Sequence, residues 1–201
     1  HAASPHLVID PLVVGAEIVL ALQTVVARNV DPLKPAVLSC TEFHTDGVRN
    51  AIPGQVRITG DTRSFDPEVQ RLLERRIREL SEGIAAAHGA MCTVTYSHEF
   101  APTINDERCA RVAGEAAVTA LGAERVDAEC APIMPSEDFG VFARHVPACF
   151  SFIGNGTVEG EGGTPLHSRS YDANDDVLAA GVAFYGAVVR AELAPLVVGP
   201  E

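Results

Sequence analysis

Residues 55–89, QVRITGDTRSFDPEVQRLLERRIRELSEGIAAAHG, decide the fold of the first half of the chain because they join a strand to a long helix. Over residues 55–62, apolar or small residues alternate with polar ones, which predicts a strand with one buried and one exposed face. Asp66 and Pro67 then supply an N-cap and a first helical residue. An apolar stripe at helical spacing continues to Gly89, where the helix is expected to end.

Three further elements are predicted around this stretch. An apolar helix opens at Asp10–Pro11 and runs to about residue 27, while residues 36–43 and 93–100 are expected to form strands. The order helix, strand, strand, helix, strand lacks only the leading strand of a β-α-β-β-α-β unit, the split βαβ sandwich. Residues 1–100 are therefore interpreted as a domain that lacks its first strand, which suggests truncation.

Residues 101–201 show a different pattern. The expected elements are a helix from Asp106 to about Gly122, a short helix with Ser136 as N-cap, a strand over residues 148–153 and a helix from Asn174 to about Leu193. Helices that alternate with strands are typical of an α/β layered domain, but the strands are too few for a complete one. This region is interpreted as part of a second domain.

Composition excludes several classes of function. The chain has 201 residues, of which 47% are hydrophobic, and a formal net charge of −12. Nucleic acid is not an expected partner, because phosphate binding needs clustered Lys and Arg. A membrane is not expected either, since the most apolar run, Leu12–Val26, is interrupted by Gly15, Glu17 and Gln23. The five scattered cysteines form no C-x-x-C pair, which favours reduced thiols in a cytoplasmic protein.

His167 is the most suggestive candidate for chemistry, because it ends a Gly-rich loop just before an acidic helix start at Asn174. A neutral imidazole in that setting can bind a metal, but a metal site needs three or four ligands. A surface or packing role for His167 therefore stays open. His1 at the start of the chain is by itself most simply a surface or capping residue, and Glu137 is sufficiently explained as an acid at a helix N-terminus.

Two polar residues of the first half are also candidates with ordinary alternatives. Asn50 lies in the connection 45–54, which is longer than a tight hairpin needs, although a loop asparagine usually satisfies backbone groups. Arg63 could bind a substrate carboxylate with its planar guanidinium, or it could pair with Asp61 or Asp66.

Six segments of the chain carry a resemblance when they are taken together and in order. They are HAASPH (1–6) with DP (10–11), RNVDPL (28–33), NAIP (50–53), GDTRSF (60–65), SEDF (136–139), and PLH (165–167) with YD (171–172) and ND (174–175). In this set and order, the chain resembles the dinuclear metallo-amidohydrolases of the hippurate hydrolase and indole-acetyl-amino-acid hydrolase group. These are relatives of the aminoacylases and zinc carboxypeptidases.

The resemblance implies a specific α/β architecture. Such enzymes combine a three-layer α/β/α catalytic domain, which holds two metals, with an inserted βαββαβ lid domain that forms the dimer interface. Residues 1–100 would then be the two-layer lid without its first strand, and residues 101–201 the C-terminal half of the catalytic domain.

The resemblance also implies roles for the candidate residues. His1 would polarise the scissile carbonyl in a partner subunit's active site, Asn50 and Arg63 would contact the substrate, and His167 would be the last metal ligand. Glu137 would lie near the site, with its role left open. The family's Cys-Gly-His-Asp-Gly-His segment, its Glu-Glu pair and its further ligand His are absent from this sequence and are expected upstream of His1, and Ser168 stands where many relatives have a second His.

The leading hypothesis is a portion of a metal-dependent amidohydrolase that cleaves N-acyl amino acids or similar small amides with a metal-activated water. Its expected partners are the substrate, a second copy of the chain and the missing N-terminal half of the catalytic domain. Its expected cofactors are two divalent ions, zinc, manganese, cobalt or nickel. The chain alone is expected to be inactive. The alternative is a non-catalytic relative that serves dimerisation or small-molecule binding.

Overall fold

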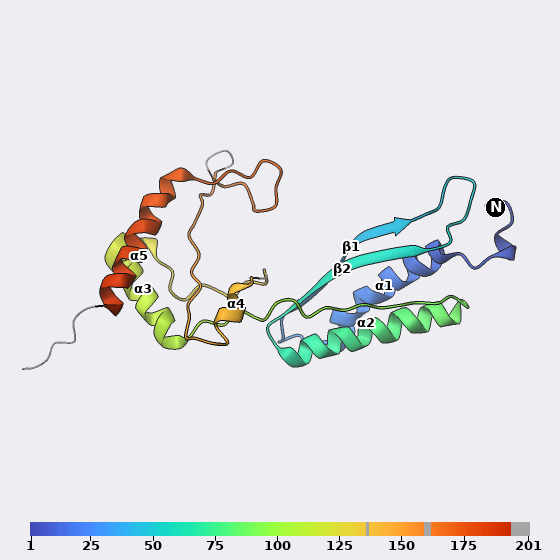
Figure 1. Ribbon diagram of the computed structural model, residues 1–201, viewed down its shortest axis with the longest axis horizontal. Helices are drawn as coiled ribbons and strands as arrows, with labels where there is room; N and C mark the ends of the chain where they lie inside the picture. The colour runs from blue at the N-terminus through green and yellow to red at the C-terminus, as the bar shows by residue number, and fades with distance from the viewer. Residues whose placement is uncertain (136, 159–161, 194–201) are drawn as a thin grey trace, which may run out of the picture. The chain divides into compact units, whose positions relative to one another are not determined.

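The computed structural model describes residues 1–135, 137–158 and 162–193, which belong to two compact units. The first unit contains His1–Pro102 together with residues 133–135, and the second contains Thr103–Pro132 and the described residues from Glu137 onward. The fold is a mixed α/β fold with a small antiparallel sheet, which lies in the first unit (Figure 1).

Two long helices and two strands make up most of the first unit. In chain order the elements are η1 (Pro5–Leu7), α1 (Pro11–Asn29), β1 (Ala36–Thr45), β2 (Val56–Ser64) and α2 (Pro67–Ala87). Both long helices begin where the sequence predicts. The carboxylates of Asp10 and Asp66 accept hydrogen bonds from backbone N–H groups of the first helical turns, and a proline follows each of these caps.

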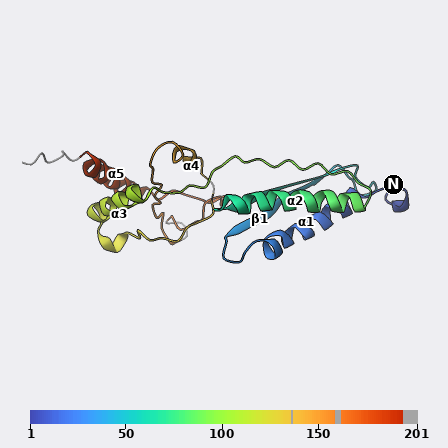
Figure 2. The same ribbon diagram turned by 90° about the horizontal axis from the view of Figure 1, so that it is seen from below.

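The sheet consists of β1 and β2, which pair antiparallel from Ala36 opposite Ser64 to Thr45 opposite Val56. The register shifts after Cys40, where one strand carries an extra residue. Both helices pack against the strands, as the two orthogonal views show (Figures 1 and 2). The sheet therefore has one face covered by helices and one face open to solvent.

The core of the first unit lies between α1, α2 and the covered face of the sheet. Its buried side chains are Val14, Ile18, Leu22, Val25, Val69, Leu73 and Ala85. Leu38 and Ile58 of the strands pack against this cluster, whereas Arg57 and Thr59 are exposed. The alternation predicted for the strand over residues 55–62 is thus confirmed in its first half.

The prediction about the apolar length of α1 needs correction. Its 19 residues, Pro11–Asn29, are long and apolar enough to cross a membrane by length and composition, although the sequence predicts that no apolar run reaches that length. In the structure the helix buries Val14, Ile18, Leu22 and Val25 against α2 and the sheet. This packing buries one face of the helix, while Leu12, Val13 and Leu20 elsewhere on it remain exposed.

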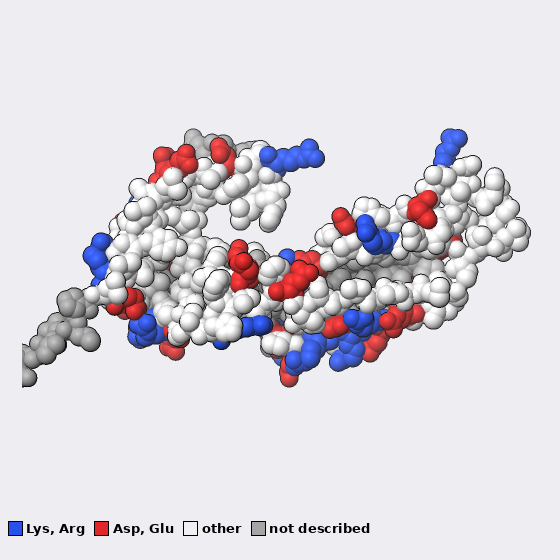
Figure 3. Space-filling view, in the orientation of Figure 1, with Lys and Arg blue, Asp and Glu red and all other residues white. Residues whose placement is uncertain are grey.

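The charged stripe on α2 is a solvated face with local ion pairs. Arg78 pairs with Glu74 and Arg76 with Glu79 at helical spacing. Acidic and basic side chains lie close together along this helix (Figure 3). The charges of this stripe are therefore paired locally along the helix.

The strand predicted over residues 93–100 is not formed. This segment pairs with no strand among the described residues, and side chains hold it instead. Arg78 donates from Nη1 to the carbonyl oxygen of Val94 at 2.6 Å, and the hydroxyls of Thr62 and Tyr96 lie 2.6 Å apart. A groove of about 690 Å³ lies between this segment and β2, with α1 and α2 side chains lining it. No described strand pairs with this segment, so its backbone has no ladder partner and it does not form a strand.

The second unit is built mainly on two packed helices. Its elements are α3 (Glu107–Leu121), η2 (Ala123–Arg125), α4 (Phe139–Phe142), η3 (Asp175–Val177) and α5 (Leu178–Glu192). Ala116 of α3 and Ala187 of α5 are buried, and the two helices contact one another. Helices begin near Asp106 and Asn174 as predicted, since each side chain accepts a hydrogen bond from a nearby backbone N–H group.

Two predictions in this unit have other outcomes. The strand predicted over residues 148–153 is absent, and the side chain of Asn105 bonds both the N–H (2.8 Å) and the carbonyl oxygen (3.0 Å) of Phe150 in place of a neighbouring strand. Ser136, predicted as an N-cap, lies outside the described residues, and α4 begins after Asp138. An apolar segment becomes a strand only when a neighbouring backbone completes its hydrogen bonds.

Candidate functional site

The structure brings two of the predicted site residues, His1 and Asn50, next to one another. The backbone N–H of Ala2 donates to the carbonyl oxygen of Asn50 at 3.0 Å, which fixes the segment after His1 against the long β1–β2 connection. Both His1 and Asn50 are exposed. They therefore form one polar surface region of the first unit.

The imidazole of His1 is oriented by a local hydrogen bond. The backbone N–H of Ala3 donates to Nδ1 of His1 at 3.1 Å. When the ring is neutral, an acceptor at Nδ1 requires the proton to be on Nε2. This tautomer can donate a hydrogen bond to an external oxygen.

The connection that carries Asn50 is ordered by its own contacts. Oδ1 of Asp46 accepts hydrogen bonds from the N–H groups of Gly54 (2.9 Å) and Gln55 (3.2 Å), which closes the base of the loop. Val48 and Ala51 form an antiparallel bridge, so Asn50 lies at the tip of a tight turn. The excess length of this connection is therefore used to present a fixed turn.

Arg63 lies near the end of β2 and pairs with the carboxylate of Asp61, two residues away on the same strand. This is the ordinary alternative that the sequence left open. Because residues i and i+2 of a strand share a face, the pair lies on the face that carries the exposed Arg57 and Thr59. Asp61 is half exposed, so a substrate carboxylate could replace it as the partner of Arg63.

In the second unit, His167 lies at the third position of a tight turn. The N–H of Ser168 donates to the carbonyl oxygen of Pro165 at 3.2 Å, and His167 has a φ of 68°. A positive φ at the third residue is the requirement of a type II turn, which normally selects Gly or Asn. His167 is exposed, and its imidazole makes no hydrogen bond to the described residues.

The described residues do not form a complete metal site. No group of three or more His, Cys, Asp or Glu residues among the described residues is placed to hold an ion. His167, with an accessible ring, has the donor chemistry of one ligand, and Glu137 is an exposed carboxylate without a described hydrogen bond. These residues fit a part of a metal site and not a whole one.

The sequence does not single out Asn155, although the structure gives it three hydrogen bonds around the base of the His167 loop. Its flanking glycines, Gly154 and Gly156, indicate only a turn. The one local indication of Asn155 in the sequence is its position between two glycines, just before a Gly-rich loop.

Comparison with known proteins relates these residues to one family. The model of peptidase family M20/M25/M40 matches residues 4–191. The hippurate hydrolase of Campylobacter jejuni is 31% identical over 92% of this chain and 47% of its own length. The IAA-amino acid hydrolase ILR1-like 2 of Arabidopsis thaliana is 34% identical over 96% of this chain and 43% of its own length.

Solved structures agree with the sequence comparison. A crystal structure from methicillin-resistant Staphylococcus aureus has a TM-score of 0.72 at 28% identity and covers 94% of this chain. The YxeP protein of Bacillus subtilis, described as a dinuclear metal-binding peptidase of the M20 family, has a TM-score of 0.65 at 27% identity and covers 92%. In both cases the match covers 47% of the solved chain.

The chain thus spans about half the length of the curated relatives that it matches. Within that half, the matched region includes the turn of Asn50, the Arg63–Asp61 pair and the His167 loop. With a family model that covers residues 4–191, the chain belongs to peptidase family M20/M25/M40.

Proposed function

We propose that this chain is a portion of a metal-dependent amidohydrolase that cleaves the amide bond of N-acyl amino acids. The observation that carries the proposal is the match over 92–98% of the chain to proteins named hippurate hydrolase, IAA-amino acid hydrolase and N-acetylcysteine deacetylase. The substrates in these three names are all N-acyl amino acids.

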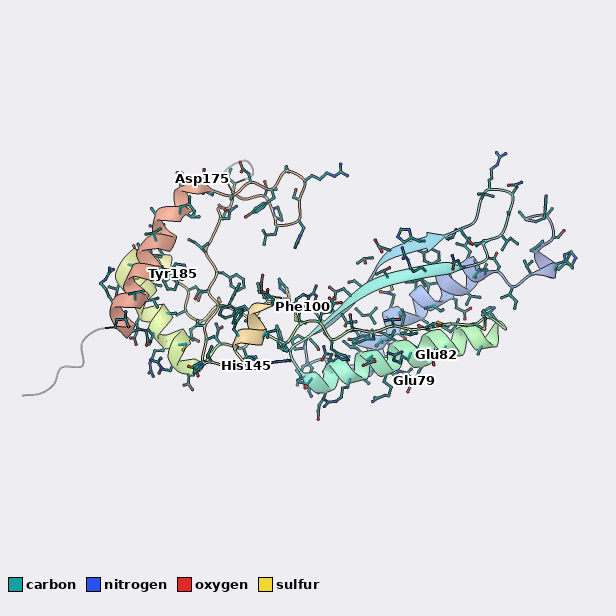
Figure 4. All side chains as sticks on the ribbon, viewed as in Figure 1. Glu79, Glu82, Phe100, His145, Asp175 and Tyr185 are labelled. Carbon is teal, nitrogen blue, oxygen red and sulfur yellow. The ribbon has the colours of Figure 1, made fainter. Side chains whose placement is uncertain are left out.

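An exposed apolar surface supports the proposal that further polypeptide belongs to the active protein. One stripe of α5 and its C-cap residue is apolar and 53–76% exposed; its members are Leu178, Val182, Tyr185, Val189 and the C-cap Leu193. Tyr185 is labelled in Figure 4. Contiguous apolar surface of this kind is typical of a face that another element covers.

Four residues would carry the chemistry of binding and polarisation. His167 would supply one imidazole ligand to divalent metal, which would activate the attacking water when bound. Arg63 would release Asp61 and form an ion pair with the carboxylate of the substrate's amino-acid part instead. Asn50 would contact the same substrate, and His1 would donate from Nε2 to the carbonyl oxygen, a contribution of about 10²–10³ in rate for one such donor.

Arg63 gives the sharpest test of the substrate class. In the complete protein, Arg63→Ala is expected to raise KM for hippurate about tenfold or more, because one charge-assisted hydrogen bond to the carboxylate is lost. The same change should leave KM for N-methylbenzamide, which has the amide but no carboxylate, nearly unchanged. Asp61→Asn is the matched control, since it removes the competing partner and retains the guanidinium. Equal losses on both substrates, or no metal-dependent hydrolysis of either by the unaltered protein, would refute the proposal.

His1 and His167 test the proposed dimer. If His1 serves the partner's site, each single alanine variant should be inactive, while a mixture of the two should regain activity. Random pairing produces one intact site in each mixed dimer, so about a quarter of the original activity is expected. The measurement is the rate of hippurate hydrolysis after the two variants are unfolded and refolded together. No recovery, with mixed dimers present by native mass spectrometry, would place His1 and His167 in the same subunit's site or in none.

A further inference from the structure

The loop that carries His167 is closed at its base by a single side chain, that of Asn155. Nδ2 of Asn155 donates to the carbonyl oxygens of Gly162 (2.7 Å) and Asp172 (3.0 Å). Oδ1 of the same amide accepts from the backbone N–H of Asn174 at 2.8 Å. One amide thus joins the two ends of the loop, since Gly162 precedes His167 in the chain and Asp172 follows it.

Close packing at this point requires glycine. Gly162 has a φ of 88°, and a Cβ atom there would collide with the carbonyl oxygen of Asn155 and lie 2.8 Å from Cβ of Asn174. The backbone passes so near Asn155 that no side chain can be accommodated at residue 162. The approach brings both loop ends within reach of the amide.

Asn155 also ties the loop to a regular element. Asn174, whose backbone it binds, caps the following turn by accepting from the N–H of Asp176 at 3.0 Å. Helix α5 begins at Leu178, directly after this turn. The base of the loop is therefore anchored to a helix, which holds a position more firmly than a loop does.

Nothing comparable fixes His167 from within the loop. Its imidazole is exposed and makes no hydrogen bond to the part of the chain that the structure describes. Its φ of 68° is costly for a residue other than Gly and persists only where surrounding contacts impose it. The N–H groups of Ser168 and Tyr171 donate only to carbonyl oxygens three residues earlier within the loop. The contacts at the base of the loop are therefore the ones that can set the position of the whole loop.

We infer that Asn155 is a positioning residue for His167: its amide holds the loop so that the imidazole has one fixed place relative to α5. The functional meaning rests on the proposed role of His167 as a metal ligand. Partners that orient metal ligands typically change metal affinity about 10–100-fold when they are removed. Asn155 acts through the loop and not by contact with metal or substrate.

Two substitutions of Asn155 separate the contributions of its donor and acceptor hydrogen bonds. Asn155→Ala removes all three hydrogen bonds. Asn155→Asp retains an acceptor for the N–H of Asn174 but loses both donors and places a carboxylate against two carbonyl oxygens. The matched control is Asn105→Asp, because Asn105 bonds both backbone groups of Phe150 in the same unit but outside the His167 loop.

The first measurement is amide hydrogen exchange on the 201-residue chain, which requires no metal. Asn155→Ala should accelerate exchange of the amides of Ser168, Tyr171 and Asn174 about tenfold or more, with amides in α3 and α5 within about twofold of the original. Asn155→Asp should accelerate Ser168 and Tyr171 but leave Asn174 protected. Asn105→Asp should change none of the three. Equal acceleration throughout α3 and α5, or none in the loop, would overturn the inference.

The second measurement is metal binding by the complete protein, by titration with zinc. Asn155→Ala should raise the dissociation constant about 10–100-fold, and Asn105→Asp less than about twofold. A loosened loop with unchanged zinc affinity would overturn the positioning role and leave the proposed function intact. Absence of zinc binding by the unaltered protein would overturn the proposed function, and with it the positioning of a metal ligand, while the exchange data would still decide whether Asn155 holds the loop.

Discussion

At the scale of single residues, Gly60 of β2 lies close against the backbone of β1. A Cβ atom at this position would lie 2.5 Å from the carbonyl oxygen of Ser39 and 3.3 Å from Cα of Cys40, next to the register shift of β1. Both atoms belong to backbone and cannot move without disturbing the pair. Gly60→Ala is therefore expected to lower the free energy of unfolding by about 1–3 kcal/mol, measured by urea denaturation.

Gly83 on α2 is the matched control for this substitution. A Cβ atom at Gly83 would meet no atom within 4 Å. Alanine in the interior of a helix is favoured over glycine by about 0.5–1 kcal/mol, so Gly83→Ala should stabilise the chain. Equal effects of the two changes would show that Gly60 is not under steric constraint.

At the scale of elements, sequence-based prediction succeeds where the determinants are local. Asp66 followed by Pro67 specifies the start of α2, because the cap and its acceptor lie within one turn. The strands predicted at 93–100 and 148–153 depend on a neighbouring backbone that their own residues do not encode. Asn105, which bonds Phe150 in place of such a neighbour, lies 45 residues away from it in the chain. No pattern in either segment reveals that contact.

Glu74 contributes to the contact between α2 and the segment after it. This carboxylate accepts from Arg78 and pairs with His98, with N–O distances of 2.9 Å to both. Hydrogen bonds from Arg78 and then from His98 hold the pKa of Glu74 below its ordinary value of 4.5. A depressed pKa means that the unfolded chain binds more protons, so this stabilisation is present above about pH 4.5 and is lost as the pH falls through the lower folded value.

Glu74→Gln should therefore reduce stability at neutral pH and flatten its dependence on pH in the acid range. The measurement is the free energy of unfolding from urea melts between pH 3 and pH 7, compared with the unaltered chain. The two curves should converge as the pH falls, because protonation of Glu74 removes the negative charge that the substitution has already removed. Curves that stay parallel down to pH 3 would show that the Glu74 contacts contribute no pH-dependent stability.

At the scale of the whole molecule, the candidate site residues are divided between the two units. His1, Asn50 and Arg63 lie in the first, whereas Glu137 and His167 lie in the second. Local chemistry leaves an ordinary alternative for each of them, and for Arg63 the structure contains that alternative. These residues are assigned to one proposed site only because their motifs occur in the same order as in a known family. Asn155 carries no such motif, and its role follows from loop ends that only the folded chain brings together.

The two units also differ in how much apolar surface they bury. The core of the first contains branched side chains, with Val25 and Leu73 at 0% exposure, whereas the buried hydrophobic residues described in the second are Ala116 and Ala187. Because stabilisation follows the apolar area buried, amides in α3 and α5 should exchange about tenfold or more faster than those in α1 and α2.

Leu73→Ala tests whether this difference comes from the separate cores. It should cost the first unit about 2–5 kcal/mol and accelerate exchange in α1 and α2, with α3 and α5 unchanged. Leu20→Ala, at a residue that is 71% exposed, is the control and should alter neither unit. Acceleration of all four helices together would mean that the two units unfold as one, because loss of one core would then expose the other.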